Sequence, residues 1–117
     1  MSLDSEDRPW GSWHVVENGD GYKVKRIVVN PQQRLSYQTH EHRSEHWVVV
    51  KGTATCVIEG VTTEVAAGGS IDVDVQDAHR IINEHEDVLV IIEVQLGDYL
   101  GEDDIIRLED DYGRHDE

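Results

Sequence analysis

Short runs rich in Val, Ile and Thr recur along most of the chain, and each is closed by Gly, Asn, Asp or Pro. The run at 22–29, YKVKRIVV, alternates apolar with charged residues and stops at Asn30-Pro31, as a strand followed by a turn does. Further runs follow at 46–52, 53–60, 61–69, 70–75, 79–83 and 88–96. Their regular spacing, close to the roughly 8–12 residues typical of sandwiches and barrels, predicts an all-β fold.

An eight-stranded antiparallel barrel with a jelly-roll connection suits runs this short, because doubling or closing the sheet removes exposed edges. No segment before residue 98 keeps a helical period over three turns. We expect an acidic C-terminal tail over 101–117, with a short helix over 102–110 as the alternative and a docking patch at Ile105, Ile106 and Leu108. At 117 residues the chain should form one domain, with its core at about 8–100.

The net charge of the chain limits the classes of molecule that it can bind. The chain carries 25 acidic against 10 basic residues, a formal net charge of -15. Such a field repels nucleic acid and anionic lipid, which excludes polyanion binding. An anionic small molecule would need a locally positive site, formed by a metal ion or by Arg and Lys. The acidic excess fits a salt-adapted host and an ordinary acidic protein about equally well.

The single cysteine, Cys56, lies in the apolar run TATCVIEG and is expected to fill the core. The N-terminus lacks the basic and apolar regions of a signal peptide. The apolar runs are far shorter than the roughly 18 residues of a membrane span. A soluble, cytoplasmic protein is therefore expected.

The stretch SYQTHEHRSEHW, at 36–47, concentrates groups that bind metals. In an extended strand, Gln38, His40 and His42 would project to one side of a sheet. Imidazole and carboxylate suit divalent metals such as zinc, and an amide oxygen is an acceptable hard donor.

Two spacings resemble the motifs of the cupin family. Gln38-x-His40, four residues, Glu45, six residues and Gly52 resemble the first motif, and the segment from Gly68 to Asn83 resembles the second. Gln38 stands where that family has the first His of its His-x-His pair. The resemblance implies the cupin double-stranded β-helix with one divalent metal ion, zinc first and manganese, iron, cobalt or nickel as alternatives. Its ligands would be Gln38, His40, Glu45 and His79.

Three turn positions also depart from the cupin motifs: Gln32 stands at the leading Gly of the first motif, and Asp74 and Gln76 replace the Pro and Gly of the second. An alternative ligand register also stays open. In it, His40-x-His42 is the metal pair and Gln38 contacts the substrate. We favour the Gln38 register, because only it reproduces both flanking spacings.

Longer stretches resemble the cupin domain of the type II mannose-6-phosphate isomerase family, which usually follows a mannose-1-phosphate guanylyltransferase domain. They are RPWGSW at 8–13, the run 22–54, HRIIN at 79–83, and the run 92–114 with YLGEDDIIR. The resemblance implies a free-standing isomerase module. It would interconvert mannose 6-phosphate and fructose 6-phosphate through an enediol intermediate, with the sugar phosphate as its small-molecule partner.

Isomerisation needs a base that reaches the C1 and C2 protons with a pKa near the working pH. His42 qualifies if it is not a ligand, and Glu93, inside the run VLVIIEVQL, qualifies if burial raises its pKa. The alternative for Glu93 is a structural carboxylate paired with Lys25 or Arg26. The phosphate needs a cation. The candidates that flank the motif strands are Lys25, Arg34, Arg43 and Arg80.

Two other functions remain open: a non-catalytic sugar- or metal-binding module, favoured by the altered turn Asp74-x-Gln76, and another metal-dependent cupin enzyme, since a fold does not fix function. A homodimer is expected, because edge strands and the apolar RPWGSW segment would gain stability by pairing.

Overall fold

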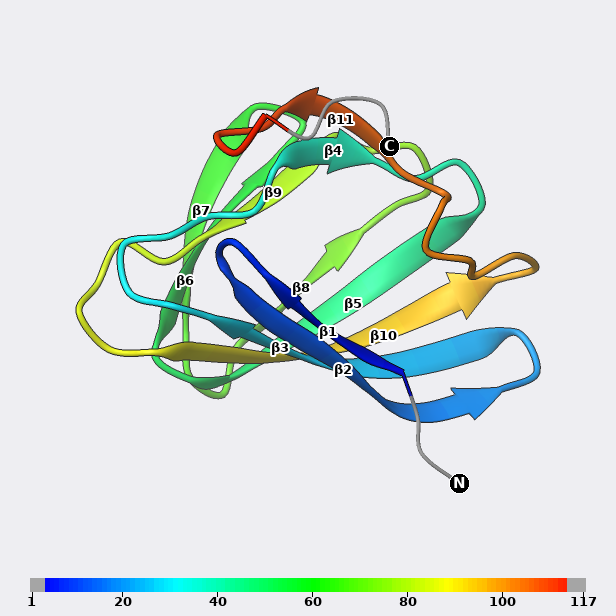
Figure 1. The fold of residues 1–117 in the computed structure, drawn as a ribbon, viewed down its shortest axis with the longest axis horizontal. Helices are drawn as coiled ribbons and strands as arrows, with labels where there is room; N and C mark the ends of the chain where they lie inside the picture. The colour runs from blue at the N-terminus through cyan, green and yellow to red at the C-terminus, as the bar shows by residue number, and fades with distance from the viewer. Residues whose placement is uncertain (1–3, 114–117) are drawn as a thin grey trace.

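A computed structural model describes residues 4–113, which form two facing antiparallel sheets and contain no helix (Figure 1). One sheet has the order β1-β2-β3-β10-β5-β8, and the other has the order β11-β4-β9-β6-β7. The strands are Ser5–Arg8 (β1), Gly11–Gly19 (β2), Tyr22–Val29 (β3), Tyr37–Thr39 (β4), Arg43–Lys51 (β5), Thr53–Ile58 (β6), Val61–Ala66 (β7), Ser70–Val73 (β8), His79–Ile82 (β9), Leu89–Gly97 (β10) and Ile106–Glu109 (β11). The predicted all-β jelly roll is confirmed. Since the described residues hold no helix, none of them forms one that could span a membrane.

The segment after residue 100 differs from the sequence-based expectation. Instead of a helix or a surface tail, it contains β11, which pairs with β4 at one edge of the five-stranded sheet. Its sparse apolar residues suit such an edge strand, because Ile106 and Leu108 stay about half exposed and do not form a buried docking patch. Ile105 lines the internal cavity described below. Residues Ile106–Glu109 thus belong to the barrel wall.

The interior has an apolar end and a polar end. The inward-facing residues of the neighbouring strands β3, β10 and β5 change from apolar to polar at the same height in the barrel. Residues directly opposite one another in antiparallel strands share a face, and Glu93 of β10 lies opposite both Lys25 and Trp47. The inward apolar positions are Ile27 and Val29 in β3, Leu89 and Ile91 in β10, and Val49 in β5, whereas the inward polar positions are Lys23 and Lys25, Glu93 and Gln95, and Arg43 and Glu45. Cys56 is fully buried in the core, as expected.

Two turns keep a backbone that usually requires glycine. Gln32 and Gln76 have φ values of 62° and 70°, in the left-handed region. At both positions the cupin motifs carry Gly. The Gln76 N–H donates to the carbonyl of His40 at 2.9 Å, so the turn before β9 still contacts the first motif. The substitutions therefore leave the motif geometry in place.

Candidate metal centre

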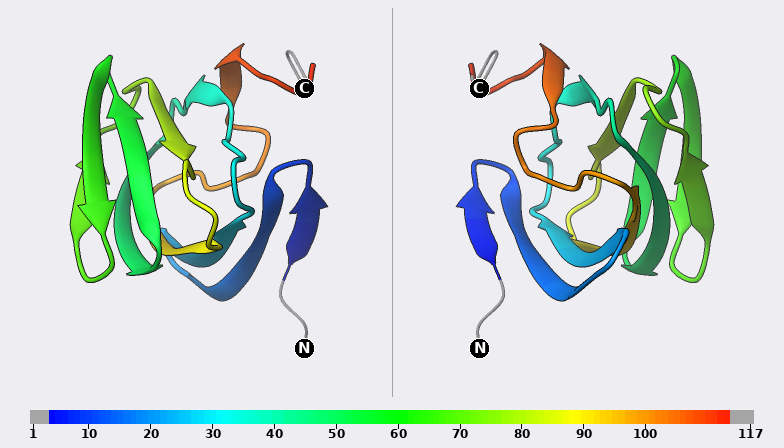
Figure 2. Two further views of the ribbon diagram at one scale, coloured as in Figure 1. Left: turned by 90° about the vertical axis from the view of Figure 1, so that its left-hand side faces the viewer. Right: turned by 90° about the vertical axis from the view of Figure 1, so that its right-hand side faces the viewer.

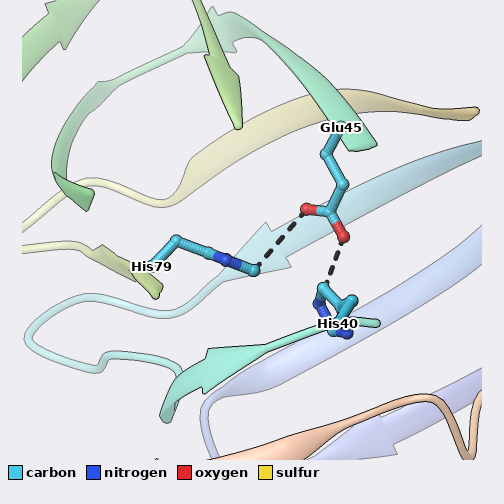
Figure 3. Close-up of side chains that lie close together, drawn as sticks. All are labelled: His40, Glu45 and His79. Carbon is cyan, nitrogen blue, oxygen red and sulfur yellow. Dashed lines mark ion pairs between the residues drawn. The ribbon is translucent and has the colours of Figure 1, made fainter. Parts of the chain in front are cut away.

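Three side chains from different segments meet at the polar end of the barrel (Figure 3). His40 follows β4, Glu45 lies in β5, and His79 opens β9. All three are buried, and their ligand atoms lie within 4.8 Å of one another. His40 Nε2 is 3.2 Å from Glu45 Oε2, and His79 Nε2 is 3.8 Å from Glu45 Oε1.

The hydrogen bonds on the far side of each ring fix which nitrogen carries the proton. His40 Nδ1 lies 2.6 Å from the carbonyl oxygen of Asp104, and His79 Nδ1 lies 2.8 Å from that of Asp77. A carbonyl only accepts, so each Nδ1 donates and each Nε2 turns a lone pair toward Glu45. Burial lowers the pKa of His40 to about 4, which keeps its ring neutral at pH 7. This orientation by outer partners is typical of metal-binding histidines.

Arg43 sets the charge of Glu45. The Arg43 Nε donates to Glu45 Oε2 at 2.8 Å, and its Nη2 donates to His40 Nε2 at 3.1 Å. Burial by itself would raise the pKa of Glu45, but the charge of Arg43, followed by the two imidazoles, holds that pKa well below its usual range. A charged carboxylate and two imidazole lone pairs therefore face one another, and such a donor set can hold a divalent metal ion.

Trp47 joins this group to Glu93. Its Nε1 donates to Glu45 Oε1 at 2.8 Å and to Glu93 Oε1 at 3.1 Å, and Gln95 Nε2 donates to Glu93 Oε2 at 2.7 Å. Burial, and then the charge of Glu45, raises the pKa of Glu93 to about 8. Burial therefore favours the neutral, protonated form of the Glu93 carboxyl group. Glu93 does not form the structural ion pair considered above, because Lys25 Nζ bonds Glu102 at 2.7 Å and Arg26 is exposed.

Gln38 lies beside the three ligands. It is buried, its Cα is opposite that of His79 across β4 and β9, and its Nε2 donates to the carbonyl of Ser36 at 3.3 Å. Both Gln38 and His79 line the same cavity. The role of Gln38 as a fourth ligand stays a prediction.

His42 lies elsewhere. It is exposed, its ring contacts the ring of Tyr99 at 5.8 Å, and it does not line the cavity. The expectation that it shares a face with His40 is wrong, because β4 ends at Thr39 and β5 begins at Arg43, so residues 40–42 form a loop. Asp104 holds this loop: its carboxylate accepts the Glu41 and His42 N–H groups at 2.9 and 3.0 Å.

The three ligands line a small, partly open cavity of about 80 Å³. One wall is apolar, with both Trp10 and Trp13. Trp13 stacks on Lys25, whose Nζ is 4.0 Å from the ring centre. Charged side chains also line the cavity. Its cations are Arg8, Lys25, Arg43 and Arg107, and its carboxyl groups are those of Glu45, Glu93 and Glu102.

Of the four predicted phosphate-binding residues, the structure brings Lys25 and Arg43 to the cavity. Arg34 pairs with Asp111 at 2.6 Å, and Arg80 pairs with Glu109 at 2.8 Å, both outside the cavity. Sequence reasoning missed Arg8 and Arg107. Arg107 reaches the cavity because it lies opposite Gln38 across β4 and β11. The sequence did not predict this strand pairing, so it could not place Arg107.

The two facing sheets and the buried cluster between them define a cupin. The oxalate decarboxylase of Lactobacillus farciminis is similar with a TM-score of 0.78 and 16% identity, covering 91% of this chain and 33% of that chain. A cupin-superfamily sugar phosphate isomerase from Silicibacter pomeroyi has a TM-score of 0.69 and 12% identity, covering 81% of this chain and 71% of its own. At these identities the likeness shows the fold alone.

Sequence comparison gives the family. The family described as "Mannose-6-phosphate isomerase C-terminal" matches residues 4–110, and the chain belongs to it. The alginate biosynthesis protein AlgA of Pseudomonas aeruginosa is 50% identical over 107 residues, and a mannose-1-phosphate guanylyltransferase of Escherichia coli K12 is 46% identical over 107 residues. Both alignments cover 92% of this chain but only 22% of the relative. The chain thus spans about a fifth of these relatives' length.

Proposed function

We propose that this chain is a metal-dependent aldose–ketose isomerase of sugar phosphates, with mannose 6-phosphate and fructose 6-phosphate as the expected pair. The observation that carries the proposal is the buried group of His40, Glu45 and His79, with both Nε2 lone pairs turned toward the carboxylate at the polar end of a cavity. Membership of the mannose-6-phosphate isomerase family supports it.

His40, Glu45 and His79 would hold the metal, Gln38 is the proposed fourth ligand, and zinc is the metal we expect. A divalent ion bound there would stabilise the negative charge that develops on the sugar oxygens of an enediolate. This chain's own residues supply the rest of the chemistry.

Glu93 is the proposed proton carrier between C2 and C1. Its pKa of about 8, raised first by burial, lies near the working pH, as proton transfer in both directions requires. Its hydrogen bonds from Trp47 and Gln95 fix the carboxyl group at the cavity wall. His42 is not proposed for this role, because it lies outside the cavity.

The phosphate is the proposed partner of the cavity's cations. Four of the chain's 10 basic residues line this one cavity, although the chain as a whole has a net charge of -15. Together with a bound metal ion, these cations would favour an anionic substrate despite the three carboxyl groups of the cavity. The alternative is a non-catalytic sugar- or metal-binding module; the turn at Gln76 that favoured it keeps a left-handed backbone, with its N–H bonded to the His40 carbonyl.

A coupled assay tests the proposal. The chain is loaded with zinc, and fructose 6-phosphate formed from mannose 6-phosphate is measured against protein stripped by a chelator, at matched salt. We expect metal-dependent turnover that Glu93→Gln abolishes while the metal stays bound. Turnover no higher than in the stripped protein would reject the enzyme and leave only a metal-binding module.

A further inference from the structure

The segment RPWGSW at 8–13 contributes to the cavity. Arg8 ends β1, and Trp10 and Trp13, which follow it, are buried, so the apolar residues of the segment are already covered within the chain. All three side chains line the cavity that holds the metal centre. The tryptophans therefore face inward, and Arg8, the one charged residue of the segment, borders the space that a ligand would occupy.

The turn that carries Arg8 is held against β3. Gly11 lies so close to that strand that a Cβ at its position would be 1.9 Å from the Val28 carbonyl oxygen. The Trp10 carbonyl accepts the Asn30 N–H at 2.9 Å. Because its backbone is fixed in this way, Arg8 offers its guanidinium to a ligand with little further loss of backbone freedom.

Three of the four Arg and Lys residues in the cavity lie beside the groups that would act on C1 and C2. Arg43 donates hydrogen bonds to two of the three candidate ligands. Lys25 lies opposite Glu93, the proposed proton carrier, across β3 and β10. Arg107 lies opposite Gln38, the proposed fourth ligand, across β11 and β4. These three cations therefore belong to the reacting end of the cavity.

Arg8 differs from them in its surroundings. Its strand, β1, is the edge strand of its sheet and lies on the side of the molecule opposite β6 and β7 (Figure 2). The Arg8 side chain is 25% exposed, and it pairs at 3.3 Å with Glu6, whose side chain is 49% exposed. An ion pair this exposed contributes little, so a stronger anion can replace Glu6 as the partner.

Arg8 also differs in its height in the barrel. It lies opposite Gly11 in β2, and Gly11 lies opposite Val29 in β3. Val29 belongs to the apolar end and is four residues from Lys25, which is about 13 Å along an extended strand. The backbone of Arg8 is therefore at the level of the apolar end, away from the reacting groups.

A hexose 6-phosphate carries its phosphate at the far end of the carbon chain from C1 and C2. If C1 and C2 lie at the metal centre, the phosphate lies away from it. We propose that Arg8 binds this phosphate and orients the sugar along the wall formed by Trp10 and Trp13. The planar guanidinium can donate two parallel hydrogen bonds to phosphate oxygens. The inference rests on the proposed function, because it takes a sugar phosphate as the ligand.

Titration calorimetry of zinc-loaded protein tests the proposal, with mannose 6-phosphate and mannose as probes. The unaltered chain should bind the phosphorylated sugar more tightly. Arg8→Gln should weaken mannose 6-phosphate binding on the order of ten- to a hundredfold, through loss of a charge-assisted contact, and leave mannose binding and metal content unchanged. Arg8→Lys, which keeps the charge without the paired donors, should recover part of this loss.

Glu6→Gln is the matched control. It removes the ion-pair partner of Arg8 and does not line the cavity, so mannose 6-phosphate should bind it at least as tightly as the unaltered chain. A loss as large as that in Arg8→Gln would make the ion pair structural and overturn the proposal. So would an Arg8→Gln protein that binds mannose 6-phosphate as the unaltered chain does. If circular dichroism shows that Arg8→Gln does not fold, Arg8→Lys carries the test, and an unchanged affinity there also overturns the proposal.

The coupled assay separates this inference from the proposed function. Binding of mannose 6-phosphate that depends on Arg8 but gives no turnover would reject the isomerase and keep the phosphate site. Turnover with the same KM in Arg8→Gln and the unaltered chain would reject the phosphate site and keep the isomerase. Where both proposals hold, Arg8→Gln should raise KM with little change in kcat, because Arg8 lies away from the reacting atoms.

Discussion

At the apolar end of the barrel, Ile27, Ile91 and Val49 meet across β3, β10 and β5, whereas further along the same strands the inward side chains are Lys25, Glu93 and Glu45. The first group stabilises by burial of apolar surface. The second is just as buried and would destabilise the fold unless each group were paired, since unpaired buried charges are costly.

The polar end meets this requirement through shared partners. Trp47 sits at the boundary, with its ring in the core and its N–H shared by Glu45 and Glu93. Arg43 is likewise shared by Glu45 and His40. The comparison shows that one end of each strand builds the apolar core, whereas the other end carries the candidate metal site. Changes at the two ends should therefore separate stability from metal binding.

The largest effect is expected from His79→Ala. Loss of one of three converging ligands should abolish metal retention and reduce turnover to that of the stripped protein, with the barrel still folded. Metal content after dialysis measures this. His42→Ala, which removes an exposed imidazole, should retain the metal. If His42→Ala empties the site and Gln38→Ala does not, the alternative ligand register is correct.

Ile91→Ala tests the apolar end. Ile91 is fully buried, so its truncation should lower the free energy of unfolding by about 2–5 kcal/mol through lost burial and a residual cavity. Urea denaturation measures the change. Val61→Ala, at an exposed site, should stay within about 0.5 kcal/mol of the unaltered chain. A loss of metal affinity in folded Ile91→Ala as large as in His79→Ala would contradict the separation of the two ends.

Glu93 should make stability depend on pH in metal-free protein. Its folded pKa of about 8 lies above its ordinary value of 4.5, so the unfolded chain ionises first as pH rises. Stability should fall by a few kcal/mol between about pH 4.5 and 8, since each pKa unit is worth about 1.4 kcal/mol. Glu93→Gln removes this contribution, so its free energy of unfolding should rise relative to that of the unaltered chain as the pH rises. Equal pH profiles for the two proteins in denaturation would show that Glu93 is ionised in the fold.

Asp104→Ala addresses the loop that carries His40. The Asp104 side chain holds the Glu41 and His42 N–H groups, and its carbonyl orients the His40 ring. Loss of such outer support should weaken metal binding about 10–100-fold, measured by competition with a chelator. Asp103→Ala, an exposed neighbour, is the control. Unchanged affinity in Asp104→Ala would mean that the carbonyl alone fixes the ring.

Much of this arrangement was readable in the sequence. Alternation along 22–29 predicted β3 with its observed bounds, and motif spacing predicted that His40, Glu45 and His79 belong together. These succeed because strand alternation is a local property and the spacing reflects a shared fold.

Other features depend on contacts between distant segments. The loop at 40–42 turns His42 away from the cavity, although a strand was the natural interpretation of alternating Gln38, His40 and His42. Strand β11 forms by pairing with β4, and its own residues include too few apolar positions to predict a strand. The cavity positions of Arg8 and Arg107 follow only once β1 and β11 are part of the sheets.

Gln76→Gly should have the smallest effect, and it is stabilising. A left-handed backbone costs a residue with a side chain roughly 1–2 kcal/mol. Glycine avoids this strain, but it loses more chain entropy on folding, which offsets about 0.5–1 kcal/mol of the gain. The Gln76 side chain contributes only an exposed hydrogen bond to Glu41 at 3.1 Å. We expect a net gain of about 0.5–1 kcal/mol in urea denaturation. Gln76→Ala loses the same hydrogen bond but keeps the left-handed strain, so it should gain nothing. Equal stability of the two variants would show that this turn, which supports the His40 loop from outside, carries no backbone strain.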